Sequence, residues 1–319
     1  MTADLPAVAV VMPVRNEERG LEASIRAVLS QDYPGPLEVC IAVAPSTDGT
    51  GRVANGLARE DDRVRVVENP LGVTPTGLNI AVRATTAPII VRVDGHAELE
   101  GGYITRAVET LRRTGAVSVG GIQDPRGTSP FEQAVGRAMG SRFGAGDARF
   151  HYGGQEGPVD TVYLGVFCRE AIEAVGLYDE SLVRNQDYEL NWRLRDAGGT
   201  VWFDPALRVG YRPRGSLRAL VRQFFQYGQW KREVVRRHPR SLRWRQAVPP
   251  AVVVAISVGF CAGMFWSPLF LLPIFYAAMV SFMSLFAGRS LGEFGRLMIV
   301  YPAIHLSWGC GFLVGVRDL

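Results

Sequence analysis

Residues 89–96 are Ile89-Ile90-Val91-Arg92-Val93-Asp94-Gly95-His96. The β-branched apolar residues at its start predict a buried strand, and the strand is followed directly by polar residues. Because side chains alternate along an extended segment, we expect Asp94 and His96 to point the same way while Gly95 lets the backbone approach a ligand. A carboxylate and an imidazole together can hold a divalent cation whose other ligands are diphosphate oxygens and water. The alternative is a polar turn with a surface histidine.

Three more strand-like runs precede this one, and helical patterns separate them. The runs are Val8–Val14, Glu38–Val43 and Val64–Val67; the helical patterns are Glu17–Ser30, Asp48–Arg59 and Thr76–Ala84. This alternation predicts an α/β fold with a Rossmann-like, mostly parallel sheet that is covered by helices on both faces. Ligands of such sheets bind at the carboxyl ends of the strands. The residues that follow each strand are therefore the candidates for chemistry.

Two of these strand ends carry polar residues that have both a structural and a functional reading. Pro13-Val14-Arg15-Asn16-Glu17 offers polar groups to a base or a ribose, but Asn16 is equally suited to cap a helix that begins at Glu17. In the turn after the second strand, Ser46 or Thr47 is expected to cap the next helix, and the alternative is that this turn faces a nucleotide.

A further candidate opens a later helix. Asn185-Gln186-Asp187 begins a predicted helix that runs to about Asp196. A carboxylate in the first turn is favoured by the helix dipole, so Asp187 is either a helix-stabilising acid or a general base that takes a proton from an acceptor hydroxyl.

Composition favours a membrane partner. The 319-residue chain carries a net charge of +4, and its arginines gather between Arg232 and Arg245. This pattern favours an anionic membrane surface and argues against nucleic acid as a partner. The four cysteines lie far apart without a CxxC pair, which argues against a zinc site and against a disulfide framework.

From Gln246 to Gly288 no charged residue occurs over 43 positions, about twice the ~20 residues that span a bilayer. We predict membrane spans at about 247–265, 268–287 and 297–316, with a re-entrant segment as the alternative for the third. Basic residues precede the first span and return at Arg289 and Arg296, whereas the turn at Trp266 is uncharged. The positive-inside rule then predicts a multi-pass protein of the cell membrane, with a cytoplasmic domain at 1–215, interface helices at 216–245 and a membrane domain at 246–319.

The interface segment 216–238 has the pattern of an amphipathic helix or helix pair lying on the membrane. It contains Gln223-x-x-Gln226-Tyr227-Gly228-Gln229-Trp230-Lys231, and Lys231 is the only lysine of the sequence. Trp230 offers an aromatic face to a sugar ring or to lipid.

Taken together, these motifs resemble the family 2 glycosyltransferases, inverting enzymes of GT-A fold. Within that family the chain looks most like the membrane-bound glucosyltransferases of succinoglycan-type exopolysaccharide assembly. The resemblance runs from Val8 to about His238, and the segments that carry it are Val91–Ala97, Asp160–Gly165, Ser181–Asp187 and Gln223–Lys231.

The resemblance implies roles for the matching positions. Pro13, Arg15 and Glu17 match the loop that binds the nucleotide-sugar. Asp94 and His96 stand at the metal-binding DxD position, which implies Mg²⁺ or Mn²⁺ as cofactor, and Asp187 matches the catalytic base.

The C-terminal motif stands where processive relatives carry QxxRW. We expect its residues near the acceptor and the leaving group; they are Gln223, Tyr227, Trp230 and Lys231. Tyr227 and Gly228 depart from the Arg-Trp pattern, so processive synthesis is not predicted.

The expected activity is transfer of one sugar from a nucleotide-sugar, UDP-glucose first, to a lipid-linked (polyprenyl) saccharide acceptor. Cell-surface polysaccharide or glycolipid biosynthesis would be the setting, alongside other polysaccharide-assembly proteins. Two alternatives remain: transfer directly onto polyprenyl phosphate, as in dolichyl-phosphate-mannose-synthase-like relatives, and a non-catalytic membrane partner that keeps the fold.

Overall fold

The computed structural model describes residues 5–146 and 148–316, and the chain divides into two compact units. The first unit comprises the residues up to Asp124 together with Gly153–Tyr211, and the second comprises Pro125–Tyr152 together with the residues from Arg212 onward. The sequence predicted three parts, 1–215, 216–245 and 246–319. In the structure the last two parts fall in one unit, which also takes in residues 125–152, because helix α5 (Pro130–Met139) packs on the C-terminal helix α13 (Leu291–Val314).

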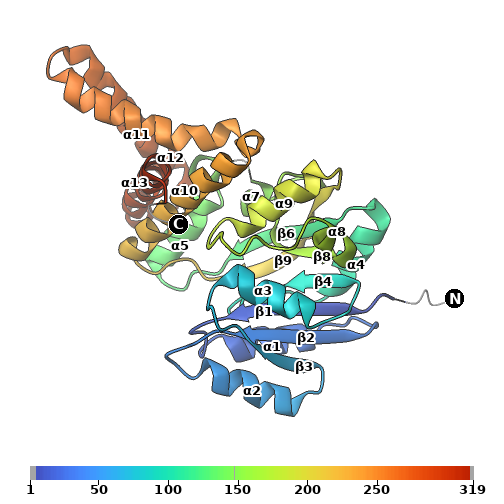
Figure 1. Ribbon diagram of the computed structural model, residues 1–319. Coiled ribbons are helices and arrows are strands. Elements are labelled where there is room, and N and C mark those ends of the chain that lie inside the picture. The colour runs from blue at the N-terminus through green and yellow to red at the C-terminus, as the bar shows by residue number, and fades with distance from the viewer. Residues whose placement is uncertain (1–4, 147, 317–319) are drawn as a thin grey trace. The chain divides into compact units, whose positions relative to one another are not determined.

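A nine-stranded sheet forms the first unit (Figure 1). Its strands are β1 (Val8–Val14), β2 (Leu37–Val43), β3 (Val64–Glu68), β4 (Ile89–Arg92), β5 (Glu98–Leu99), β6 (Ser118–Pro125), β7 (Gly157–Pro158), β8 (Tyr163–Cys168) and β9 (Val201–Tyr211). The order is β3-β2-β1-β4-β8-β6-β9-β5, and β7 pairs with β9. β1 to β4 are parallel, which confirms the predicted α/β sheet, while β8 runs antiparallel to both β4 and β6.

Helices cover both faces of this sheet. They are α1 (Leu21–Leu29), α2 (Thr50–Glu60), α3 (Thr74–Arg83), α4 (Tyr103–Thr114), α8 (Arg169–Ala174) and α9 (Gln186–Asp196). Val8 and Val10 of β1 lie in one core with side chains of α1, α2 and α4, whereas Ala9 and Val11 lie in another core with α3, α8 and α9. Because successive side chains of a strand point to opposite faces, one apolar run supplies both cores.

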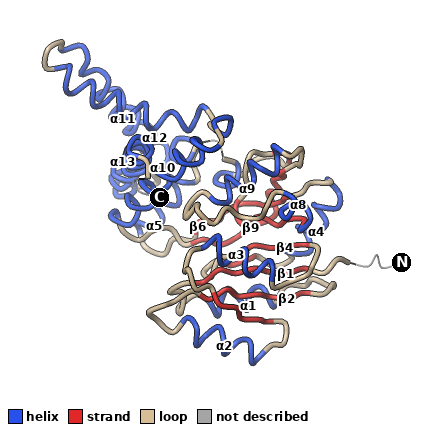
Figure 2. Tube along the Cα trace, in the orientation of Figure 1, coloured by secondary structure: helices blue, strands red, loops and turns tan. Residues whose placement is uncertain are grey.

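The second unit is built from helices. Beside α5 and α13 it contains α6 (Arg142–Ala145), α7 (Arg149–Tyr152), α10 (Leu217–Arg237), α11 (Trp244–Gly263) and α12 (Leu271–Ala287). Figure 2 shows these helices and their connecting loops in blue and tan. The predicted helix or helix pair at 216–238 is a single helix, α10.

Three segments of this unit are long and apolar enough to cross a membrane: Trp244–Gly263, Ser267–Ala287 and Leu291–Val314. The first two expose many large apolar side chains, among them Phe286 at 72%. The third is more covered, since its His305 Nε2 lies 2.7 Å from the carbonyl oxygen of Phe143 in α6 and its Nδ1 lies 3.2 Å from the Tyr276 hydroxyl of α12.

Helices α10 and α13 approach to backbone contact. A Cβ atom on Gly228 would lie 2.0 Å from the carbonyl oxygen of Trp308, and one on Gly311 would lie 2.0 Å from that of Phe225. Only glycine fits at such a crossing. Gly228 of the C-terminal motif therefore has a packing role.

Candidate active site

The loops that follow β1 and β2 are tied together by Asn16. Its side-chain Oδ1 accepts a hydrogen bond from Thr47 N (2.8 Å), and its backbone N donates to Ser46 Oγ (3.1 Å). Helix α1 begins only at Leu21, so the expectation that Asn16 caps a helix at Glu17 is wrong. Ser46 and Thr47 do not cap α2 either, because Asp48 Oδ1 accepts from Thr50 N (3.0 Å) at that helix start.

The predicted nucleotide-binding residues lie along this loop edge of the sheet. Pro13 is half-buried in β1, and Arg15 is exposed, with its Nη1 donating to the carbonyl oxygen of Gly72 in the β3–α3 loop (3.4 Å). Glu17 N donates to Thr50 Oγ1 (2.8 Å). The loops after β1, β2 and β3 thus form one connected rim.

The segment Asp94–Ala97 is a turn. β4 ends at Arg92, and Ala97 N donates to the Asp94 carbonyl oxygen (3.0 Å), so strand alternation does not set the directions of Asp94 and His96. Gly95 is buried: a Cβ there would lie 3.0 Å from Glu17 Cγ. The expectation that Gly95 lets a ligand approach the backbone is therefore replaced by a packing role against the β1 loop.

Asp94 and Asp187 meet on one guanidinium group. Arg92 Nη2 lies 3.0 Å from Asp94 Oδ1, and Arg92 Nη1 forms an ion pair with Asp187 Oδ1. Asp187 lies in the first turn of α9, as the sequence predicted. Its carboxylate bonds Arg92, and α9 has no side-chain cap hydrogen bond, although an acid in the first turn is still favoured by the helix dipole.

The two carboxyl groups hold protons differently. Burial raises the pKa of Asp187 and the neighbouring Asp94 charge adds to this, while Arg92 opposes it; the net pKa is raised. Burial acts in the same direction on Asp94, but the charges of Arg92 and His96 outweigh it, and the net pKa is lowered. The pKa of Asp187 thus lies above that of Asp94, a split that acid–base sites use.

His96 is oriented by Glu17. Its Nδ1 lies 2.9 Å from Glu17 Oε1, and such a contact sets which ring nitrogen a metal ion would bind. Among the described residues no three His, Cys, Asp or Glu side chains gather as a metal site. The metal-binding role of Asp94 and His96 therefore stays a prediction.

The four predicted acceptor residues lie on α10, in the second unit. Gln223 Nε2 donates to the Tyr227 hydroxyl (2.8 Å), and Gln223 Oε1 accepts from Arg214 Nε (3.3 Å). Trp230 is half-buried, and Lys231 is only 3% exposed.

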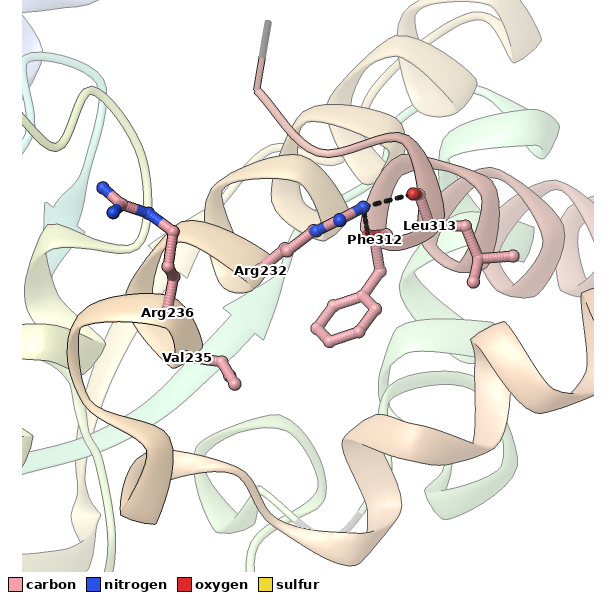
Figure 3. A pocket seen from close by; sticks show the side chains of 5 residues that line it. All are labelled: Arg232, Val235, Arg236, Phe312 and Leu313. Atoms are coloured by element: carbon pink, nitrogen blue, oxygen red, sulfur yellow. Dashed lines mark hydrogen bonds between the residues drawn. The ribbon is translucent and has the colours of Figure 1, made fainter.

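An open pocket lies close to this motif in the sequence, because the first residue that lines it directly follows Lys231. It is lined by Arg232, Val235, Arg236, Phe312 and Leu313 (Figure 3). Arg232 Nη1 donates to carbonyl groups in the last turn of α13, at Phe312 (3.4 Å) and Leu313. None of the four predicted acceptor residues lines this pocket.

Sequence reasoning missed Arg92. The signal was present, because a cation inside an Ile/Val strand must find an anionic partner once the strand is buried. The identity of that partner, 95 residues further on, was not visible in the sequence.

The chain is similar to known proteins in sequence. The family model described as "Glycosyl transferase family 2" matches residues 9–176. The chain is 31% identical over 306 residues to the succinoglycan biosynthesis protein ExoA of Rhizobium meliloti (strain 1021), covering 95% of this chain and 93% of that protein. It is 26% identical over 241 residues to the glycosyltransferase AglE of Haloferax volcanii, covering 73% of this chain and 76% of that protein.

Solved structures show a likeness of fold. The mannosyltransferase PcManGT from Pyrobaculum calidifontis, in complex with GDP-Man and Mn²⁺, superposes with a TM-score of 0.66 at 19% identity, covering 92% of this chain and 86% of that one.

Proposed function

Because the chain belongs to glycosyl transferase family 2, we propose that it moves a sugar from a nucleotide-sugar donor to a lipid-linked saccharide acceptor, with inversion at the anomeric carbon. The chain is a glycosyltransferase, and its GT-A fold agrees with the one that the motifs predicted. Similarity to a succinoglycan biosynthesis protein supports a role in cell-surface polysaccharide or glycolipid biosynthesis. UDP-glucose is the first donor to test.

The observation that carries this proposal is the meeting of Asp94 and Asp187 on Arg92. Sugar transfer to a hydroxyl requires a carboxylate that takes the hydroxyl proton and, near it, a group that holds the leaving diphosphate. Asp187 and Asp94 differ in pKa in the direction that these two roles require.

In the proposed mechanism, Asp187 accepts the proton of the acceptor hydroxyl as the acceptor oxygen attacks the anomeric carbon. The bond between that carbon and the diphosphate oxygen breaks on the opposite face, which inverts the configuration. Pro13, Arg15 and Glu17 lie on the rim that would hold the nucleotide.

Asp94 and His96 would hold a divalent cation, Mg²⁺ or Mn²⁺. The donor set fits, because Glu17 orients the His96 ring and the Asp94 pKa is lowered, so that its carboxylate stays ionised. Such a cation, when bound, neutralises charge that develops on the leaving diphosphate. The solved structure of the mannosyltransferase contains Mn²⁺, which supports a test of this ion first.

We propose that α11, α12 and α13 cross the cell membrane and that the first unit is cytoplasmic. Length and apolar composition support the three spans. Arginines crowd the segment before α11 and recur at Arg289 and Arg296, whereas the Trp266 turn is uncharged, and this asymmetry supports the orientation. α10 would then lie at the membrane surface with Gln223, Tyr227, Trp230 and Lys231. There it would contact a polyprenyl-linked acceptor that other assembly proteins make.

The test is nucleotide release by the detergent-purified protein from a panel of UDP-, GDP- and dTDP-sugars. Two acceptors are compared, a lipid-linked saccharide and bare polyprenyl phosphate, and Asp187→Asn is compared with Asp196→Asn at the other end of the same helix. We expect release with one donor that requires the lipid-linked saccharide, is lost in Asp187→Asn, persists in Asp196→Asn and is sensitive to EDTA.

Other outcomes lead to different conclusions. Release that needs only polyprenyl phosphate would replace the proposed acceptor. Near-normal turnover by Asp187→Asn would remove the base assignment, and a folded protein that releases nothing from any donor would favour a non-catalytic partner.

A further inference from the structure

Arg92 is a buried cation in an otherwise apolar strand. Its neighbours in β4 are Ile89, Ile90 and Val91, and its own side chain is 5% exposed. Burial of an unpaired guanidinium costs several kcal/mol, so this residue persists only where anions compensate it. Both anions that do so here are carboxylates of the proposed site.

The guanidinium engages each carboxylate through one oxygen. Nη2 binds Asp94 Oδ1 and Nη1 binds Asp187 Oδ1. The second oxygen of each carboxylate, Oδ2, makes no hydrogen bond with any residue that the structure describes. Each aspartate therefore has one oxygen held by Arg92 and one left for a ligand.

The planar shape of the group makes this arrangement specific. The two terminal nitrogens of a guanidinium lie at a fixed separation, so two carboxylates bound to them are fixed relative to one another. Two neighbouring carboxylates would otherwise repel each other and turn apart. A lysine ammonium is a single point charge on a flexible stem and cannot impose the same geometry.

We infer that Arg92 is the positioning residue of the transfer reaction: it aims Asp187 Oδ2 at the acceptor hydroxyl and Asp94 Oδ2 at the donor diphosphate. This inference rests on the proposed function. Arg92 acts through the two aspartates and contacts neither substrate.

The test is a double-mutant cycle with transfer kinetics and separately measured donor binding. The variants are Arg92→Met, Arg92→Lys, Asp187→Asn and Arg92→Met/Asp187→Asn. We expect Arg92→Met to lower kcat by about 100-fold, since misplacing a reacting group by about 1 Å has an effect of this size. Arg92→Lys should restore less than about a tenth of the kcat that Arg92→Met loses. An ammonium group supplies the charge but not the two nitrogens at a fixed separation.

The decisive result is non-additivity. If Arg92 acts through Asp187, the double variant should be no more than about 3-fold slower than Asp187→Asn alone, since residues that act as a unit are not additive. If the two substitutions instead lowered kcat by independent factors that multiply in the double variant, the inference would be overturned and Arg92 would be a stabilising residue only. Recovery of kcat to near the wild-type value by Arg92→Lys would also overturn it.

A matched control separates loss of an ion pair from loss of positioning. Arg106 of α4 binds the buried Asp204 at 2.8 Å in the same unit and has no place in the proposed chemistry. Arg106→Met should lower the thermal midpoint and leave kcat unchanged at a permissive temperature. If Arg92→Met does not fold, the same cycle is run with Arg92→Lys.

The cycle also separates this inference from the proposed function. Full activity of Asp187→Asn would disprove the base assignment whatever Arg92 does. Loss of activity in Asp187→Asn together with normal kcat in Arg92→Met would leave the proposed function standing and reject the positioning role.

Discussion

The contact between Glu17 and His96 gives a residue of the β1 loop a second possible task. The family resemblance assigns Glu17 to nucleotide binding, but its Oε1 lies 2.9 Å from His96 Nδ1. A carboxylate behind a histidine fixes the tautomer and the ring direction of a metal ligand. These two roles make different kinetic predictions.

We predict that Glu17→Ala raises the half-saturating Mn²⁺ concentration by about 10-fold or more, because loss of an outer-shell partner weakens a metal site by that order. The maximal rate at saturating Mn²⁺ should stay close to that of the wild type. The measurement is a Mn²⁺ titration of transfer activity, with the metal-dependent change in intrinsic fluorescence as an independent readout of binding.

Glu18→Ala is the control, since Glu18 lies in the same loop but pairs with Arg52 (2.7 Å). It should leave the Mn²⁺ titration unchanged. A Glu17→Ala variant with an unaltered Mn²⁺ curve and a raised donor KM would show instead that Glu17 contacts the nucleotide.

At the scale of elements, the crossing of α10 and α13 depends on glycine. Each helix contributes one glycine to the crossing, Gly228 in α10 and Gly311 in α13. A Cβ atom added at either position would clash with the backbone of the other helix. The C-terminal motif is therefore partly a packing motif, and its Gly228 is required by the neighbouring helix.

We predict that Gly311→Ala destabilises the second unit by about 1–3 kcal/mol, the usual effect of overpacking. Gly295→Ala in the same helix meets nothing within 4 Å and should be neutral or stabilising, by up to about 1 kcal/mol. Thermal unfolding in detergent compares the two variants; equal midpoints would show that α10 and α13 are not in backbone contact.

Helix α5 begins with a capping box that should make stability depend on pH. Backbone hydrogen bonds from Ser129 and Thr128, with Arg212 and the Thr128 hydroxyl, lower the pKa of Glu132 to about 2 against the opposing effect of burial. A lowered folded-state pKa means that the unfolded state binds the proton more readily, so this stabilisation is complete above the ordinary pKa of 4.5 and is lost as pH falls towards about 2.

Glu132→Gln should therefore be less stable than the wild type near neutral pH, and the difference should shrink as pH falls below about 4.5. The measurement is the free energy of unfolding in detergent from near-neutral pH to about pH 3. A difference that does not change with pH would show that the Glu132 carboxylate is not held in its ionised form.

At the scale of the whole molecule, the first unit is formed from two separate stretches of the chain. Residues 125–152 leave the sheet after β6 and pack in the second unit, where Arg137 of α5 pairs with Glu293 of α13. Val135, Ala138 and Met139 of α5 are buried there. The part of the chain that precedes α10 thus contains a helix whose partners come later.

We predict that a fragment of residues 5–211 is insoluble, although it contains every strand of the sheet, because α5 would expose the apolar face that α13 covers. The full chain in detergent should be monodisperse under the same conditions. The measurement is size-exclusion chromatography after expression of each; a soluble, cooperatively unfolding fragment would show that the first unit does not need the second.

The sequence by itself determined the elements and the family. Apolar β-branched runs predicted β1 to β4 to within one residue at each end, because such patterns depend on neighbours along the chain. The helical patterns between them predicted α2 and α3 to within two residues, whereas α1 begins four residues later than predicted. Charge-free length marked the helices that are apolar enough for a membrane. Short motifs placed the chain among the glycosyltransferases.

Only the tertiary structure decided what those elements bring together. The antiparallel strands at β8 and β9, the passage of residues 125–152 into the second unit, and the backbone contact of α10 with α13 all depend on pairings between distant segments. The same holds for the meeting of Asp94 and Asp187 on Arg92, since local periodicity carries no information on which of many carboxylates will reach a buried cation 95 residues away.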